Sequence, residues 1–455
     1  MNAMKPNVLL LVIDGLRADR FSGPLKTSYT PNMDKLKNTG IFFNQAVSSS
    51  DATWICVGSI LSSLYPIQSG ITRFTNHEKS SIIFDFMKKN GYHTFATVKN
   101  TIFFQTLTSD LDGKDLFPID NGYLFEDFGN VGKIILDRLN SENFKAPWFY
   151  YIHIMDLHRN VDYPLPEEFK DEKYGNSDYD KMISGIDTWI GKILEKIDLK
   201  NTLVILTSDH GDFLPIEKIG HEMSYIPALA DNARKIKQHT PTSLEPLGLK
   251  LYFILRSLML PFRKKKLSLE LSKQELRTLS TYGTNQMWDL FEEIIRVPLV
   301  FSGFGIPSQK TISQQVRHID IFPTVMEILN LKQTYPVEGQ SLAPLFHDKD
   351  IEEHPAIIQN MTTNPKKPHN VIGLRTPNYK YYRSIENAEK SVTLFDLTND
   401  PHENHNIAKN EKKIVQEMEE YLTHFISNSS SDDIQSLDDE KLDIVADELK
   451  KLGYV

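Results

Sequence analysis

Two apolar, strand-like runs in this chain each end in a carboxylate. Residues 8–13 lead directly into Asp14, and residues 203–208 lead into Asp209 and His210. Apolar runs of this length are typical of strands buried in a parallel sheet. Such sheets place their chemistry at the carboxyl ends of the strands, so we expect the two ends to lie together. A single Asp after a strand often only starts a turn, but two carboxylates with an imidazole suit a divalent cation.

Length and composition limit the class of protein. A chain of 455 residues favours a large α/β domain with a smaller partner. The net charge of −9 argues against a nucleic-acid partner, which requires a basic surface. Cys56 is the single cysteine, which excludes an internal disulfide and a thiolate metal cluster. Residues 8–13 resemble a core strand rather than a signal peptide, and no apolar run is long enough for a membrane span, so we expect a cytoplasmic protein.

Residues 1–345 alternate apolar β-type runs with helical patterns, which predicts a large, mostly parallel sheet flanked by helices. We expect strands at 41–47, 93–98, 148–154, 203–208 and 297–302, and helices at 32–38, 55–63, 81–90, 178–197 and 321–329. Thr30 and Pro31 predict the cap and first turn of the first of these helices.

The C-terminal part has a different pattern. Short β-type runs predict a small antiparallel sheet at 371–374, 379–383 and 393–397. Charged helical patterns follow at 410–426 and 438–452. The predicted organisation is a catalytic domain over 1–345, a small α+β subdomain over 346–409 and a charged helical tail over 410–455.

Residues 223–284 are predicted to form a helical insertion in the catalytic domain. Within it, 247–266 combines a largely apolar stretch with the basic run Arg263-Lys-Lys-Lys266. An apolar helix beside a basic cluster suits peripheral contact with an anionic membrane surface. The alternative is a lid packed over the active site, because buried amphipathic helices are commoner.

A third feature lies between the two carboxylate-bearing strand ends. Thr53 precedes a helical segment that ends in Leu61-Ser-Ser-Leu-Tyr-Pro66. This segment resembles the sulfatase family of the alkaline phosphatase superfamily, in which a nucleophile precedes a helix ending in a Leu-Thr-Gly-x-Tyr-Pro-like sequence. The family's spacing back from Pro66 implies that Thr53 occupies the nucleophile position. The resemblance also implies the alkaline-phosphatase-like α/β fold.

The resemblance continues along most of the chain in the family's order. Its further segments are Thr30-Pro-Asn-Met-Asp-Lys-Leu, Gly91-Tyr-His-Thr-Phe-Ala-Thr-Val-Lys99, His153-Ile-Met-Asp-Leu-His158, Phe291-Glu-Glu-Ile-Ile-Arg-Val-Pro-Leu, His318-Ile-Asp-Ile-Phe-Pro-Thr and Leu394-Phe-Asp-Leu-Thr-Asn-Asp-Pro. The family's pattern implies that Lys99 contacts the substrate anion and that His158 faces the substrate.

Departures from the family pattern change the expected chemistry. Sulfatases convert a Cys or Ser to formylglycine, and Thr53 cannot form that aldehyde because its β-carbon carries a methyl group. Val57 stands where an arginine is expected, and Gly15 stands where the second of two aspartates is expected. Cys56 is out of register with the nucleophile. A Thr nucleophile and an Asp-Gly start resemble the superfamily's phosphodiesterases and phosphotransferases.

The resemblance and the residues together imply one divalent metal ion (Mn²⁺, Ca²⁺, Mg²⁺ or Zn²⁺) held by Asp14, Asp209 and His210. A threonine hydroxyl is a weak nucleophile until a base or a metal lowers its pKa. The ion would bind Thr53 as an alkoxide and polarise a substrate oxygen. Attack would then give a phosphothreonine that water or an acceptor alcohol resolves. A helix cap is the alternative role for Thr53.

Four further residues are candidates for the reaction. His158 and His221 are expected to protonate the leaving oxygen or to hold the transferred group. Lys99 would offset the anion's charge and Asn100 would donate a hydrogen bond. The alternative for Lys99 is a solvent-exposed side chain.

The predicted function is a metal-dependent hydrolase or transferase acting on a phosphate ester or phosphodiester. The substrate class is an anionic ester of a small molecule, glycan or lipid head group. Two alternatives remain: a sulfuric ester hydrolase without formylglycine, and a catalytically silent relative that binds an anionic glycan or lipid. His153 and Asp156 are candidates for a second metal, but their spacing differs from the Asp-x-x-x-His of two-zinc relatives, which favours one ion.

Overall fold

The computed structural model describes residues 5–70, 82–119, 121–158, 165–214, 272–281, 290–307, 309–360 and 370–429. The chain divides into one compact unit of residues 1–212 with 289–455 and a second of residues 213–288. In the second unit, helix α12 (Lys273–Thr281) lies within the predicted insertion. His221 and the predicted segments 247–266 and 438–452 lie outside the described residues. No helix in the described ranges is long and apolar enough to cross a membrane.

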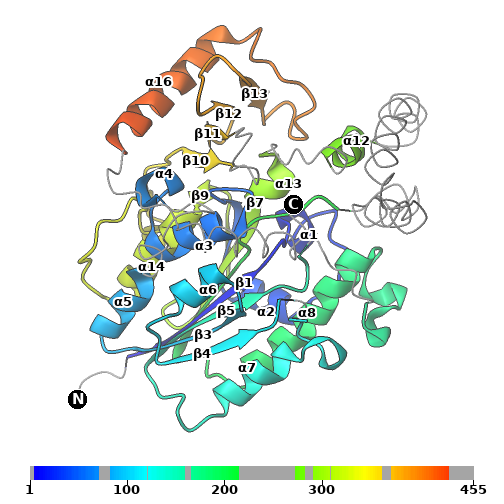
Figure 1. The fold of residues 1–455 in the computed structure, drawn as a ribbon, viewed down its shortest axis with the longest axis vertical. Helices are drawn as coiled ribbons and strands as arrows, with labels where there is room; N and C mark the ends of the chain where they lie inside the picture. The colour runs from blue at the N-terminus through cyan, green and yellow to red at the C-terminus, as the bar shows by residue number, and fades with distance from the viewer. Residues whose placement is uncertain are drawn as a thin grey trace, which may run out of the picture. The chain divides into compact units, whose positions relative to one another are not determined.

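The first unit is built on a nine-stranded sheet with the order β4-β3-β5-β1-β6-β7-β2-β8, in which β9 also pairs with β2 (Figure 1). The strands are β1 (Asn7–Ile13), β2 (Ile41–Val47), β3 (His93–Lys99), β4 (Gly113–Phe117), β5 (Trp148–Ile154), β6 (Thr202–Thr207), β7 (Arg296–Gly303), β8 (Lys310–Ile312) and β9 (Val316–Arg317). The five strands from β4 to β6 are parallel, and β7 is antiparallel to both of its neighbours. The predicted mostly parallel α/β sheet is therefore confirmed.

Strand β7 reverses direction because of where the chain re-enters the sheet. Its first residue, Arg296, pairs with Val47 at the end of β2, and Leu299 pairs with Thr207 at the end of β6. The chain thus leaves β6 and enters β7 at the same edge of the sheet. A strand that begins at that edge has to run antiparallel to β6.

Helices cover both faces of the large sheet (Figure 1). The helices of this unit that precede the small sheet are α1 (Ala18–Phe21), α2 (Pro31–Thr39), α3 (Thr53–Ser62), α4 (Pro66–Ser69), α5 (Ile82–Lys89), α6 (Ile102–Leu107), α7 (Val131–Leu139), α8 (Asp178–Leu194), α13 (Glu292–Ile295), α14 (Ile321–Ile328) and α15 (Ala343–Phe346). Helices α3, α5, α6 and α14 share a core with Val8, Leu10 and Val12, whereas α1, α2, α7 and α8 pack with Leu9, Leu11 and Ile13. Both faces of β1 are buried, which explains its uninterrupted apolar sequence.

Helix α2 has the predicted position and the predicted N-cap residue, but the capping hydrogen bonds come from another helix. Thr30 occupies the N-cap position without a side-chain capping bond, and its hydroxyl instead donates to Asp34. The carboxylate of Asp187, on α8, accepts hydrogen bonds from the backbone nitrogens of Asn32 (3.1 Å) and Met33 (2.7 Å). Thr30 is therefore the N-cap residue, as predicted, but a distant carboxylate rather than its own hydroxyl satisfies the free amides of the helix start.

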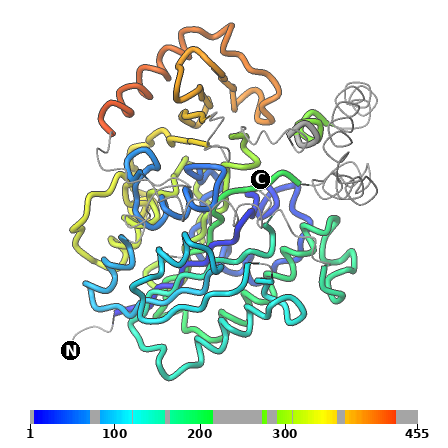
Figure 2. The backbone as a smooth tube through the Cα atoms, viewed as in Figure 1, coloured from blue at the N-terminus to red at the C-terminus, as the bar shows by residue number. Residues whose placement is uncertain are grey.

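The predicted small antiparallel sheet is confirmed and has one additional strand. It consists of β10 (Ala356–Gln359), β11 (Val371–Arg375), β12 (Tyr379–Ser384) and β13 (Thr393–Asp396), and α16 (Lys412–Asn428) packs on it. Figure 2 traces the path of the chain from the large sheet into this second sheet. Buried ion pairs join the small sheet to α13: Arg375 Nη2 lies 2.9 Å from Glu292 Oε2, and Lys380 contacts both Glu292 and Glu403.

Candidate active site

Asp14, Asp209 and His210 meet at the carboxyl edge of the large sheet. Strands β1 and β6 are parallel neighbours, with Val12 beside Thr207, so the turns that follow them are adjacent. Both aspartates are fully buried and His210 is 5% exposed. One ligand atom from each of the three residues lies within 4.8 Å of the other two. The structure therefore brings together three groups that are suited to hold one cation.

Thr53 is the first residue of α3, and its hydroxyl points to this cluster. Its Oγ1 donates to Asp14 Oδ2 at 3.3 Å and lies 3.3 Å from His210 Nε2. Ala52 occupies the N-cap position and makes no side-chain capping bond. The alternative of a capping threonine is therefore not observed. The positive end of the helix dipole at this position favours an anion beside the hydroxyl.

The two aspartates fit a cation because each has one buried oxygen that accepts no hydrogen bond. Asp14 Oδ1 and Asp209 Oδ2 are buried and accept no hydrogen bond. The other oxygen of Asp209 accepts from the backbone nitrogens of Gly15 (3.3 Å) and His210 (2.7 Å). Buried carboxylate oxygens without donors are costly unless a cation binds them. The donor set of two carboxylates and one imidazole is consistent with Mn²⁺ or Zn²⁺.

Side chains that sequence reasoning missed hold the two turns in place. Ser208 accepts from the backbone nitrogen of Leu16 at 3.0 Å and donates to the carbonyl of His210. Tyr179, on α8, donates to the carbonyl of Gly15 at 2.7 Å and accepts from the backbone nitrogen of Arg17 at 3.0 Å. Ser208 precedes Asp209 directly and was identifiable by that position, whereas Tyr179 has no sequence signal because it is distant along the chain.

The charges of the cluster shift one another's ionisation. Asp14 is buried, which opposes ionisation, but nearby His158, His153 and His210 hold the pKa of Asp14 well below its usual range. Burial, and then the charge of Asp14, raise the pKa of Asp209. The imidazole of His210 is also buried, yet the two carboxylates raise its pKa. The cluster thus contains one strongly acidic carboxyl and one that ionises reluctantly without a cation.

The predicted substrate-side residues occupy different environments. Lys99, at the end of β3, is 4% exposed, so the alternative of a solvent-exposed side chain is wrong. His158 is 5% exposed, and burial lowers its pKa to about 4, so its imidazole is neutral near neutral pH. Asn100 is exposed, and its Oδ1 accepts from Gln105 Nε2 at 2.7 Å.

Two departures from the family pattern have structural reasons. Gly15 has φ +73°, and a Cβ there would lie 3.3 Å from the carbonyl oxygen of Leu157. An aspartate at this position would therefore be strained. Cys56 is buried within α3, donates to the carbonyl of Ser50 at 3.1 Å, and has a pKa that burial raises. A thiol in this state is not an activated nucleophile.

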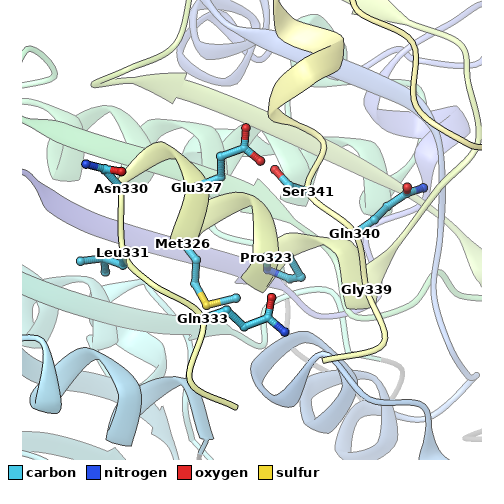
Figure 3. A pocket seen from close by; sticks show the side chains of 9 residues that line it. All are labelled: Pro323, Met326, Glu327, Asn330, Leu331, Gln333, Gly339, Gln340 and Ser341. Atoms are coloured by element: carbon cyan, nitrogen blue, oxygen red, sulfur yellow. The ribbon is translucent and has the colours of Figure 1, made fainter. Parts of the chain in front are cut away.

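An open hollow of about 390 Å³ lies beside α14, in the first unit (Figure 3). It is lined by Pro323, Met326, Glu327, Asn330, Leu331, Gln333, Gly339, Gln340 and Ser341. None of the candidate site residues lines it. Its polar side chains are amides, one hydroxyl and one carboxylate, and these groups alone do not form a catalytic site.

The chain matches two known protein families. Residues 6–331, more than half of the sequence, match the sulfatase family. The chain belongs to the sulfatase family. Residues 283–428 of this sulfatase-family protein also match the family described as N-sulphoglucosamine sulphohydrolase, C-terminal. The family resemblance read from Thr53, Pro66 and the later segments is confirmed.

Individual relatives of this sulfatase-family chain are distant. A sulfatase from Formosa agariphila is 23% identical over 467 residues, covering 90% of this chain and 84% of that protein. The chain spans about a third or less of two other curated relatives, 32% and 28% of their lengths.

Solved structures show the same fold. A 2-O GAG sulfatase has a TM-score of 0.63 at 16% identity, with 96% of each chain covered. A phosphonate monoester hydrolase of Agrobacterium radiobacter has a TM-score of 0.62 at 17% identity, covering 95% of this chain and 97% of that one. The same scaffold therefore occurs in proteins named for sulfate-ester and for phosphonate-ester hydrolysis.

Proposed function

We propose that this sulfatase-family protein is a cation-dependent phosphoester or phosphodiester hydrolase, or a phosphotransferase, with Thr53 as the nucleophile. One observation carries the proposal: the Thr53 hydroxyl lies 3.3 Å from both Asp14 Oδ2 and His210 Nε2. An unmodified hydroxyl at this position suits phosphoryl transfer, and it cannot become the formylglycine that sulfatases use.

Asp14, Asp209 and His210 would hold the cation, with Thr53 beside them. When bound, a divalent cation supplies Lewis-acid stabilisation of negative charge on the substrate and on the attacking oxygen. The protein's own part is positional: the turn after β1 and the turn after β6 fix the two carboxylates, and the start of α3 directs the hydroxyl toward them. This arrangement reduces the entropic cost of bringing the nucleophile to the substrate.

The reaction balances as two displacements. The Thr53 hydroxyl releases its proton as its oxygen forms a bond to phosphorus, the bond to the leaving oxygen breaks, and the leaving oxygen takes up a proton. Water or an acceptor alcohol then attacks the phosphothreonine, and the Thr53 oxygen regains a proton. Lys99 is proposed to offset substrate charge, and His158 and His221 are proposed to exchange protons with the leaving or attacking oxygen. Because His158 is neutral near neutral pH, its imidazole can accept a proton before it donates one.

Sulfate-ester hydrolysis is the second candidate, because the family match and the Formosa agariphila relative both favour it. A panel of aryl phosphate, phosphodiester, phosphonate and sulfate substrates, each with Mn²⁺, Mg²⁺, Ca²⁺ or Zn²⁺, separates the two. Turnover of sulfate above all phosphorus esters would overturn the first proposal. Absence of turnover throughout would favour a catalytically silent binder of an anionic glycan or lipid.

Intact-mass analysis of protein that has been exposed to a phosphate-ester substrate and quenched with acid tests directly whether Thr53 is the nucleophile. We expect one covalent phosphoryl group on the wild-type protein, mapped to Thr53, and none on Thr53→Val. The variant Thr101→Val is the matched control, because Thr101 is another buried threonine at the start of a helix, where its hydroxyl caps α6. An adduct on Thr53→Val equal to that on the wild type would contradict the assignment.

A further inference from the structure

His153 is a buried histidine beside the candidate metal centre. It lies in β5, the strand next to β1, and is completely buried. Its Nε2 is 3.5 Å from Asp14 Oδ2 and has no other polar neighbour within hydrogen-bond distance. A buried ring nitrogen without a partner is costly, so its placement against a carboxylate requires an explanation.

The opposite side of the ring is fixed. His153 Nδ1 lies 2.8 Å from the hydroxyl of Tyr151, and the ring packs against Phe104 with centroids 5.0 Å apart. An ionised carboxylate only accepts hydrogen bonds, so we assign the imidazole proton to the nitrogen that faces Asp14. Nδ1 then accepts from the hydroxyl of Tyr151. The two neighbours together fix both the orientation and the tautomer of the imidazole.

We propose that His153 is a positioning residue that holds the carboxylate of Asp14, and that Tyr151 orients His153 for this role. The inference rests on the metal centre of the proposed function. It assigns a role to a histidine that is neither the nucleophile nor one of the three candidate ligands.

The two aspartates differ in how they are held, and this difference supports the assignment. Two backbone N–H groups bind one oxygen of Asp209, and those donors are fixed by the fold. Asp14 Oδ2 instead faces the side chains of Thr53 and His153. When the Thr53 hydroxyl turns to a substrate, it no longer restrains Asp14. His153 would then keep Oδ2 in place and leave Oδ1, which accepts no hydrogen bond, available to a cation.

The position of His153 favours an indirect role over ligation. Its Nε2 is not among the ligand atoms that lie within 4.8 Å of one another in the described part of the chain. Groups that bind a metal ligand from behind orient that ligand, and their loss commonly weakens metal binding by about 10- to 100-fold.

The test is titration of Mn²⁺ into the chelator-treated full-length protein, with the dissociation constant measured by calorimetry. We expect His153→Leu to raise the dissociation constant by about 10- to 100-fold. His153→Gln places an amide N–H near the position of Nε2 and should recover most of the affinity. Tyr151→Phe should weaken binding by a smaller factor, because the ring remains but its orientation is less restricted.

Tyr150→Phe is the matched control on the same strand. Tyr150 is equally buried, and its hydroxyl is 2.7 Å from Thr97 Oγ1, so this variant also loses a buried hydrogen bond in β5. We expect it to lower the melting temperature of the cation-free protein without changing the Mn²⁺ dissociation constant. If Tyr150→Phe and His153→Leu weaken Mn²⁺ binding equally, the effect comes from general destabilisation and the inference is wrong.

Two other results would overturn the inference. Wild-type affinity in His153→Leu would show that Asp14 needs no such restraint, while leaving the proposed function intact. X-ray absorption of the Zn²⁺ form that shows two imidazoles in the wild type and one in His153→Leu would make His153 a ligand. Absence of Mn²⁺ and Zn²⁺ binding by the unmodified chain would overturn the proposed metal centre and this inference with it.

Discussion

Asp156→Asn is expected to stabilise the protein at alkaline pH. Asp156 follows β5, is 2% exposed, and has one oxygen that accepts from the backbone nitrogen of Leu124 at 3.1 Å. Burial raises its pKa from 3.8 to about 7. Because the folded-state pKa is the higher one, the carboxyl's contribution to stability is fully present below about pH 4 and is lost as the pH rises through about 7.

The size of the effect follows from that shift. About three pKa units correspond to about 4 kcal/mol at 1.36 kcal/mol per unit, which is the upper limit of the stability lost on ionisation. An asparagine keeps the acceptor for Leu124 but introduces a buried amide group, whose lack of a partner costs about 1–3 kcal/mol. The variant should therefore be more stable than the wild type by about 1–3 kcal/mol above pH 8, and this advantage should decrease by about 2–3 kcal/mol as the pH falls from 8 to 5.

Urea denaturation of both proteins between about pH 5 and pH 9, without added cation, measures this difference. Subtracting the two curves cancels the contributions of all other titrating groups. Asp85→Asn is the control, because the Asp85 side chain is 54% exposed. A stability difference between the wild type and Asp156→Asn that stays constant over this pH range would refute the reasoning.

Three further predictions concern the supports of the site and of the small sheet. Tyr179→Phe removes the hydrogen bond to the Gly15 carbonyl, so calorimetry should show weaker Mn²⁺ binding together with a stability loss of about 1–3 kcal/mol. Lys380→Met leaves Glu292 and Glu403 buried without their lysine and should cost about 3–5 kcal/mol in urea denaturation; unchanged stability would contradict this. Removing the cation with a chelator should lower the melting temperature, and returning it at about 100 times the dissociation constant should restore about 2.7 kcal/mol. An identical melting temperature with and without cation would count against the metal centre.

The sequence predicted the elements whose pattern is local. The apolar runs that became β1 and β6 are buried on both faces of the sheet. Strands of this kind have apolar residues at every position, instead of alternating apolar and polar residues, and are recognisable for that reason. Residues placed immediately after such strands, Asp14 and Asp209, meet because neighbouring parallel strands end at one edge. Thr53 required the family resemblance as well, since a threonine before a helix is by itself an ordinary cap.

Other features depended on contacts between distant segments. The short, mostly polar sequence of β4 carries little strand signal and forms a strand because it pairs with β3. The direction of β7 follows from the edge at which the chain re-enters the sheet. The cap of α2 comes from Asp187, far along the chain.

By itself, the sequence determined that this chain forms an α/β sheet with two carboxylates and a histidine at one edge, because apolar runs that become buried strands, and the residues directly after them, are visible in the local sequence. The tertiary structure decided which oxygen of each carboxylate stays free, that the Thr53 hydroxyl faces Asp14, and that His153 and Tyr179 support the site. Those features depend on distances of about 3 Å between residues far apart in sequence. No local pattern encodes such distances, because they arise only when the whole sheet and its covering helices are packed.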